Sequence, residues 1–190
     1  MKTDYTMKTD NELMVMAGTG DKFAFEDLVN RYKKKAYYLA LKLVGDPADA
    51  SDISQEAFIR VYRARTRFNP DKTFFSWFYT IIANLARNHI KKGLVRKDYR
   101  KTVQDESRAK SLEAAPSPEN QLVSQQTKKE VWEAIEKLSF EHREIIVLRH
   151  FEDLSYEEIA DTIGIPVGSV MSRLYYARKK LKEILEDNHE

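Results

Sequence analysis

The chain has 190 residues, a formal net charge of +2 at pH 7 and no cysteine. This length suits one ordinary domain or two small ones. The lack of cysteine excludes a disulfide framework, zinc sites built on thiolates and a thiol redox sensor in this chain. Residues 1–10 are polar and the apolar stretches are short. We therefore expect no signal peptide and no membrane insertion, and a cytoplasmic location.

The charged residues form three blocks along the chain. Residues 66–101 contain nine basic and two acidic side chains, residues 127–163 contain five basic and ten acidic ones, and residues 164–182 contain five basic ones and no acid. Two basic segments on either side of an acidic one suggest two surfaces that contact phosphate groups. Solvated helix faces would give the same pattern, so charge alone leaves nucleic-acid binding open.

The pattern of apolar residues predicts an all-α fold with two small helical domains joined by a flexible linker. Apolar residues recur at helical spacing, most glycines and prolines stand between these stretches, and strict alternation of β-branched residues is absent. We expect a polar segment over residues 1–21, a first domain over 22–92 and a linker over 93–116, where the periodicity is lost. A second domain is expected over residues 117–187.

The first domain is predicted to contain three helices. A loop over residues 65–72, with Phe68-Asn69-Pro70, separates the second from the third. Phe75 and Phe78 belong to the apolar stripe of the third helix, and we assign both to the core. The helices are expected over residues 25–44, 48–64 and 73–92.

The second domain is predicted to end in a helix-turn-helix. Ser155-Tyr156-Glu157-Glu158 forms a capping box, Gly164 provides the turn and Pro166 stands at the start of the next helix. The last helix presents hydroxyl groups, arginines and tyrosine, which suits a DNA major groove. A generic helical hairpin with a basic outer face is the alternative. The helices are expected over residues 118–138, 141–150, 156–163 and 167–185.

Three motifs resemble those of bacterial sigma factors. Asp52-Ile53-Ser54-Gln55-Glu56-Ala57-Phe58 is similar to the region 2.2 signature, and residues 77–88 resemble the helix of regions 2.3 and 2.4. Residues 154–160 and 166–174 resemble region 4.2. The resemblance covers residues 22–182 and is to the extracytoplasmic-function group, the minimal two-domain sigma factors, which act in transcription initiation and in stress responses.

The resemblance implies three binding surfaces. One surface binds a coiled coil of the largest subunit of core RNA polymerase. Its carboxylates would pair with basic residues of that coiled coil, and its aromatic rings would be the buried anchors of the contact. Its residues are Asp52, Gln55, Glu56, Phe58 and Tyr62. A second binds the opened −10 promoter element, where amides and aromatic rings hold an unstacked base and basic residues contact phosphates. Its residues are Phe68, Asn69, Trp77, Asn84, Arg87, Lys91 and Lys92, although Trp77 also suits a core position.

The third surface is the last helix, which the resemblance places in the major groove of the −35 element. Arg173 has the chemistry to pair with guanine through two hydrogen bonds. Met171 and Tyr176 stand where the family commonly has basic residues, so a different −35 preference or weaker salt-dependent binding is expected. The residues of this surface are Ser169, Met171, Ser172, Arg173, Tyr176, Arg178 and Lys179.

The family also implies partners and leaves alternatives. Core RNA polymerase, promoter DNA and an anti-sigma factor, often anchored in a membrane, are the expected partners, and no cofactor is expected. A regulator that binds a symmetric operator alone, as a dimer, would use the same helix-turn-helix but leaves residues 25–92 unexplained. An enzyme is disfavoured because no glycine-rich phosphate loop, cysteine nucleophile or close histidine pair is present. An adaptor that binds only protein would not need the basic last helix.

Overall fold

The structure, a computed structural model, describes residues 5–100 and 129–187. Every regular element in these two ranges is a helix, in agreement with the all-α prediction. Four helices form the first domain: α1 (Asp10–Gly18), α2 (Lys22–Val44), α3 (Pro47–Ala64) and α4 (Phe74–Arg100), with a short 3-10 helix, η1 (Arg65–Arg67), before α4. The second domain contains a helix over residues 129–136, then α6 (Phe140–His150), α7 (Tyr156–Ile163) and α8 (Val167–Asp187).

Local sequence sets the ends of the helices in the first domain. Asp21 accepts hydrogen bonds from two amides of the first turn of α2, so this helix begins three residues before the expected Phe25. Gly45 ends it in the left-handed conformation, at φ 80°. Asp46 then caps α3, whose first residue is Pro47. Gly45 and Asp46 thus separate the two helices expected over residues 25–44 and 48–64.

The structure corrects the expectation for the N-terminal segment. Residues 1–21 were expected to be a polar segment, but α1 lies within it and buries Leu13, Met14 and Ala17 completely. Thr9 and Glu12 form a capping box at its start. That signature is legible in the sequence, but the nine-residue helix is too short to show a clear apolar period.

The structure also corrects the start of the linker. The helix expected to end at Lys92 continues through Gly93 to Arg100 as part of α4. A single glycine inside a helix is destabilising by only about 1 kcal/mol relative to alanine, and its neighbours are helix formers. Residues 101–116 of the expected linker, and the first part of the helix expected over 118–138, lie outside the described residues.

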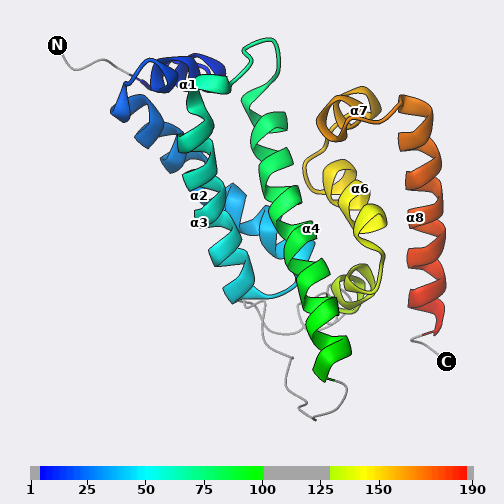
Figure 1. The fold of residues 1–190 in the computed structure, drawn as a ribbon. Coiled ribbons are helices and arrows are strands. Elements are labelled where there is room, and N and C mark those ends of the chain that lie inside the picture. The colour runs from blue at the N-terminus through cyan, green and yellow to red at the C-terminus, as the bar shows by residue number, and fades with distance from the viewer. Residues whose placement is uncertain (1–4, 101–128, 188–190) are drawn as a thin grey trace, which may run out of the picture.

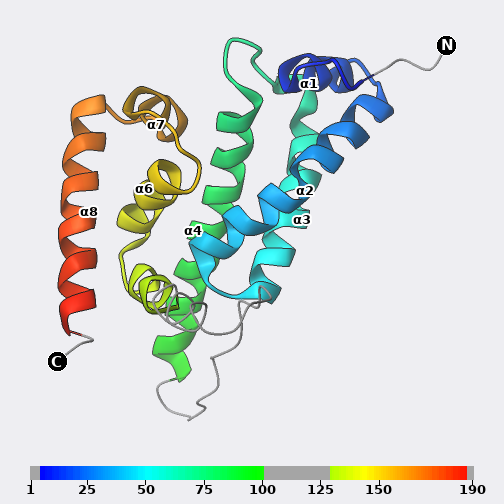
Figure 2. The same ribbon diagram turned by 180° about the vertical axis from the view of Figure 1, so that it is seen from behind.

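The two domains pack side by side (Figure 1). The core of the first domain lies between α2, α3 and α4, where Phe74, Phe78 and Tyr79 are fully buried. In the second domain α6 lies between α4 and α8, with α7 at one end (Figure 1). Seen from behind, α2 crosses α4 and its C-terminal end approaches α6 (Figure 2). The closest approaches of helices between the domains are those of α4 to α7 and of α2 to α6.

Candidate nucleic-acid interface

The loop before α4 is held by an aromatic cluster. Phe68 is half-buried, and its ring centroid lies 5.3 Å from that of Trp77 and 6.4 Å from that of Phe74. The exposed Asn69 accepts a hydrogen bond from the amide of Asp71 at 3.0 Å, which closes a tight turn. Phe68 therefore anchors the loop, while Asn69 is presented to solvent.

Asn11, on α1, fixes the other end of this loop. Its side-chain nitrogen donates to the backbone oxygens of Pro70 and Lys72, at 3.1 and 2.9 Å. Its side-chain oxygen accepts from the amide of Phe74, the first residue of α4, at 2.7 Å. One amide side chain thus satisfies three backbone groups of the loop. The sequence analysis missed this residue because its hydrogen-bond partners are 59 or more residues away in the sequence. No local pattern connects residues so far apart.

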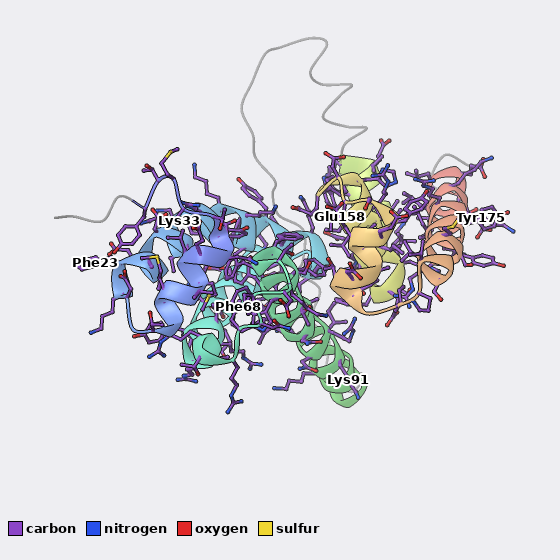
Figure 3. The ribbon with its side chains drawn as sticks, turned by 90° about the horizontal axis from the view of Figure 1, so that it is seen from above. Phe23, Lys33, Phe68, Lys91, Glu158 and Tyr175 are labelled. Carbon is purple, nitrogen blue, oxygen red and sulfur yellow. The ribbon has the colours of Figure 1, made fainter. Side chains whose placement is uncertain are left out.

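Four of the candidate −10 residues line one cavity of about 400 Å³ at the junction of α4 and α7: Asn69, Trp77, Asn84 and Arg87. Arg67 and Lys72 add positive charge to its wall. Phe68, Lys91 and Lys92 are not among its lining residues. Lys91 and Lys92 are exposed farther along α4, and Figure 3 shows Lys91 on the part of this helix that extends away from the body of the protein.

Arg87 is engaged by an acidic residue of the second domain. Its guanidinium lies 3.3 Å from a carboxylate oxygen of Glu144, on α6, and also donates to Asn84 at 3.3 Å. The Glu144 side chain is only 3% exposed. Burial raises the pKa of this carboxyl, while Arg87 and Arg173 act in the opposite direction. The carboxylate therefore pairs with an arginine of the candidate −10 surface, and the charge of an arginine of the candidate −35 surface also acts on it.

The candidate polymerase-binding residues divide into polar and aromatic groups on α3. Asp52 and Gln55 are exposed, and Glu56 forms a salt bridge with Arg60 at 2.8 Å. Phe58 is half-buried against the core residue Phe78, with ring centroids 5.0 Å apart. The fifth residue, Tyr62, packs on Phe25 and beneath the guanidinium of Arg65. The two aromatic rings thus serve the fold and leave only part of their surface for a partner.

The helix-turn-helix has the predicted local structure. Ser155 and Glu158 form the capping box of α7, and Gly164 ends this helix in the left-handed conformation, at φ 70°. Ile159, on α7, and Val170 and Leu174, on α8, are buried. They fix α8 against the rest of the domain and leave its other face outside.

Most candidate −35 residues are exposed on α8, but two have protein partners. Arg173 is half-buried and its charge opposes the rise in the pKa of Glu144, and the guanidinium of Arg178 lies 3.3 Å from Nε2 of His150. Burial, together with Arg178 and Arg149, lowers the pKa of His150. The hydroxyl of Ser172 donates to the backbone oxygen of Gly168. Ser169, Met171, Tyr176 and Lys179 complete the exposed set.

Tyr175 is an exposed residue that the sequence analysis did not select. Its side chain is 64% exposed, and its ring contacts that of Tyr176 edge to face at 5.3 Å. In Figure 3 it points away from the protein on the outer side of α8. An aromatic residue beside Met171 and Tyr176 gives this helix an apolar surface as well as a basic one. Helical spacing from the buried Leu174 would have identified it.

Neither a metal centre nor a membrane span is found in the described part of the chain. Over residues 5–100 and 129–187, no cluster of three or more histidine or carboxylate side chains is arranged to hold a metal ion. In the same ranges, every helix is too short or too polar to cross a bilayer.

Two family models match the chain in the expected order. Sigma-70 region 2 matches residues 28–94, and sigma-70 region 4 matches residues 128–181. The chain is 36% identical over 185 residues to the RNA polymerase sigma-H factor of Pseudomonas aeruginosa, covering 95% of this chain and 96% of that protein. It is also 36% identical to the ECF RNA polymerase sigma-E factor of Escherichia coli, covering 91% of this chain and 92% of that one.

Solved structures show the same fold. One is CnrH in complex with the cytosolic domain of CnrY, with a TM-score of 0.68, 24% identity and coverage of 95% of this chain and 99% of CnrH. Another is the sigma factor RpoE in complex with the anti-sigma factor NepR from Bartonella quintana, with a TM-score of 0.67, 23% identity and coverage of 85% and 96%. The chain belongs to the extracytoplasmic-function sigma factors, and the first and second domains are its region 2 and region 4 domains.

Proposed function

We propose that this sigma factor binds core RNA polymerase through the exposed edge of α3 and brings two separate DNA-reading surfaces to a promoter. The observation that supports this most directly is the cavity beside α4, where Asn69, Asn84, Trp77 and Arg87 meet. Amide groups, an aromatic ring and a guanidinium are the groups that hold an unstacked base and its phosphate. Lys91 and Lys92 extend this basic surface along α4.

The region 4 domain would bind the −35 element through α8. An exposed helix of this kind fits the major groove, where Arg173, and Arg178 once released from His150, would contact guanine or phosphate. Met171, Tyr175 and Tyr176 would favour thymine, because its methyl group accepts apolar contacts. Ser169, Ser172 and Lys179 would contact phosphates or base edges around them.

Neither surface is expected to bind promoter DNA tightly alone. Polymerase would fix the two domains at the spacing of the two promoter elements, so that each binds at the high effective concentration set by the other. We place this activity in the cytoplasm, where the DNA and the polymerase are, and assign the chemistry of RNA synthesis to the polymerase. CnrH and RpoE are each bound to a protein partner in the solved structures, and we propose an anti-sigma factor as the regulator of this chain too.

The decisive experiment is run-off transcription with core RNA polymerase on fragments of the source genome, with and without the protein. New start sites that share −10 and −35 motifs are the expected result. Absence of new starts would overturn the proposal, and a footprint by the protein alone on a symmetric site would replace it with a stand-alone regulator.

A further inference from the structure

The cavity at the junction of α4 and α7 has walls from both domains. Trp77, Asn84 and Arg87 belong to region 2, and residues 161–164, at the end of α7, belong to region 4. Its volume of about 400 Å³ lies within the range of sites that hold small organic ligands, about 300–1,000 Å³. A space of this size can accept a free small molecule as well as one base of a DNA strand.

Hydroxyl groups hold the two walls of the cavity together. The side-chain oxygens of Ser76, on α4, and Thr162, on α7, are 2.9 Å apart. Thr80, one turn farther along α4, donates to the backbone oxygen of Thr162 at 3.2 Å. All three residues line the cavity, so its shape is set before a ligand arrives. A preformed site loses little free energy to ordering when a ligand binds.

The charged groups of the cavity are only partly paired. The Arg87 guanidinium lies 3.3 Å from a carboxylate oxygen of Glu144. Arg67 and Lys72, which precede α4, line the same cavity and are exposed, and neither forms a salt bridge with another described residue. Two such cations in one concave site attract an anion. A ligand with two adjacent phosphate groups would bind both of them.

Trp77 offers a fixed ring on which a planar base can stack. Its ring centroid lies 5.3 Å from that of Phe68 and 6.4 Å from that of Phe74, and its side chain is half-buried. The part of Trp77 that these contacts leave open lines the cavity. Stacking on an indole favours a purine over a pyrimidine, because the two fused rings of a purine cover more of it.

Polar groups from both domains line the cavity beside this ring. Asn69 and Asn84, from region 2, carry amides that donate and accept hydrogen bonds. Asp161, on α7, is exposed and forms no salt bridge with another described residue. A carboxylate accepts two parallel hydrogen bonds from the neighbouring N–H groups of guanine, whereas adenine presents no such pair of donors. Asp161 therefore favours guanine.

We infer that this cavity binds a free guanine nucleoside diphosphate, held by both domains of one chain. The purine stacks on Trp77, Asp161 accepts hydrogen bonds from its edge, and Arg67 and Lys72 bind the phosphates. The inference rests on the proposed function of the cavity, because the same ring and amides would hold an unstacked promoter base. The nucleotide and the promoter strand therefore compete for this site. A ligand that contacts both domains also stabilises the folded free chain by linkage.

Fluorescence titration of the free protein with guanosine diphosphate tests the inference. The chain has two tryptophans, so a Trp132→Phe background reports Trp77 alone. We expect saturable quenching of Trp77. Adenosine diphosphate and guanosine should each bind at least about tenfold more weakly, because one lacks the paired donors and the other lacks the phosphates. Quenching that does not saturate, or equal affinities for the three compounds, would overturn the inference.

Charge variants test whether the phosphates bind in the cavity. Arg67→Gln/Lys72→Gln should weaken binding of guanosine diphosphate at least about tenfold, because both phosphate contacts are removed. Lys33→Gln/Lys34→Gln makes the same change in net charge at exposed positions of α2 that do not line the cavity, and it is the matched control. The control should bind the nucleotide as the background does. Equal losses in the two double variants would mean that only overall charge attracts the nucleotide.

Asp161→Asn tests the contribution of the second domain. The amide has a similar size but replaces one acceptor oxygen with a donor, so the preference for guanosine diphosphate over adenosine diphosphate should be lost. Glu157→Gln, exposed on the same helix and outside the cavity lining, should keep the preference. A preference that persists in Asp161→Asn would contradict the inference.

The titrations use no polymerase, so their outcome is separate from that of the proposed function. If the chain directs transcription but shows no saturable nucleotide binding, the function stands and the inference is wrong. If the chain yields no transcripts with core polymerase, the proposed function fails, and the titration alone decides whether the cavity binds the nucleotide.

Discussion

Arg143 and Leu43 join the two domains through a single hydrogen bond: Nη1 of Arg143, on α6, donates to the backbone oxygen of Leu43 at the end of α2, at 2.6 Å. Arg143 is 8% exposed, and its other terminal nitrogen donates to the backbone oxygens of Glu136 and Leu138. Burial lowers its pKa, and the nearby Glu136 carboxylate opposes this. One guanidinium thus satisfies carbonyl groups from both domains, including one that the end of α2 leaves without a helical partner.

Replacing Arg143 with methionine should destabilise both domains. Arg143→Met leaves buried carbonyl groups without hydrogen-bond donors. The free energy of unfolding should therefore fall by about 2 kcal/mol. The two tryptophans, Trp77 and Trp132, lie in different domains, so urea unfolding can be followed for each domain in Trp132→Phe and Trp77→Phe backgrounds. Both transitions should shift to lower urea concentration.

The matched control is Arg149→Met, on the same helix. Arg149 donates to Leu154 at 3.0 Å, within its own domain, so only the Trp132 transition should move. If Arg143→Met also moved the Trp132 transition alone, the bond to Leu43 would contribute nothing to the packing of the domains.

Asn11→Ala should weaken promoter opening without reducing polymerase binding. The substitution removes the cap of Phe74 and both hydrogen bonds to the loop, for an expected loss of about 1–2 kcal/mol of stability. Because the loop presents Asn69, we expect run-off transcripts to fall several-fold while co-sedimentation with core polymerase is unchanged.

The control for this prediction is Asn30→Ala, which removes an exposed asparagine on α2 whose side-chain oxygen accepts a hydrogen bond from Lys33. Its transcription should equal that of the natural chain. A comparable loss in both variants would mean that the effect of Asn11 is not exerted through the loop.

The contrast between Asn11 and Ser155 explains what the sequence could and could not predict. Ser155 and Glu158 are three residues apart, so the capping box, the turn at Gly164 and the helix-turn-helix follow from local pattern. Asn11 binds backbone groups about sixty positions away, and Glu144 meets Arg87 across 57 positions. No periodicity records such pairs, because they depend on how whole helices pack.

The same limit applies to the individual site residues. Exposure of Asp52, Met171 and Tyr176 follows from helical spacing and agrees with the structure. Phe58 and Phe68 have aromatic side chains that suit a binding surface, yet both are half-buried against Phe78 or Trp77. An aromatic residue at the edge of the core packs against buried side chains and is also partly exposed. The sequence alone does not show how much of its surface is buried.

The packing of the two domains should strengthen as the pH falls. The pKa of Glu144 is raised above 4.5 by burial, against the effects of Arg87 and Arg173, while Glu141 adds to the increase. A carboxyl with a higher pKa in the packed state takes up a proton more readily there. The contribution of this carboxyl to the free energy of domain packing is therefore fully present below pH 4.5. It is lost as the pH rises through the raised pKa.

Small-angle scattering of the free protein measures this dependence. The radius of gyration should increase as the pH rises from 4.5 through the raised pKa of Glu144, as the ionised carboxyl disfavours packing. The side chain in Glu144→Gln is neutral at every pH, so the radius of gyration of this variant should increase less. The increase that remains is due to Glu136, because burial raises the pKa of that carboxyl as well. An unchanged profile in Glu144→Gln would exclude Glu144 as the titrating group.

Tyr176→Arg should increase both the affinity for −35 DNA and its dependence on salt. Tyr176 is 58% exposed on α8, so an arginine there can reach a phosphate without repacking the domain. One added phosphate contact steepens the slope of log affinity against log salt concentration by about 0.9. The slope is measured by fluorescence anisotropy of a duplex taken from a start site found by run-off transcription, with the protein bound to core polymerase. Glu186→Gln adds the same charge at the far end of α8, where the slope should stay as it is. Equal slopes for the two variants would place Tyr176 outside the DNA contact, whereas a steeper slope for Tyr176→Arg alone would establish that this face of α8 meets the phosphate backbone.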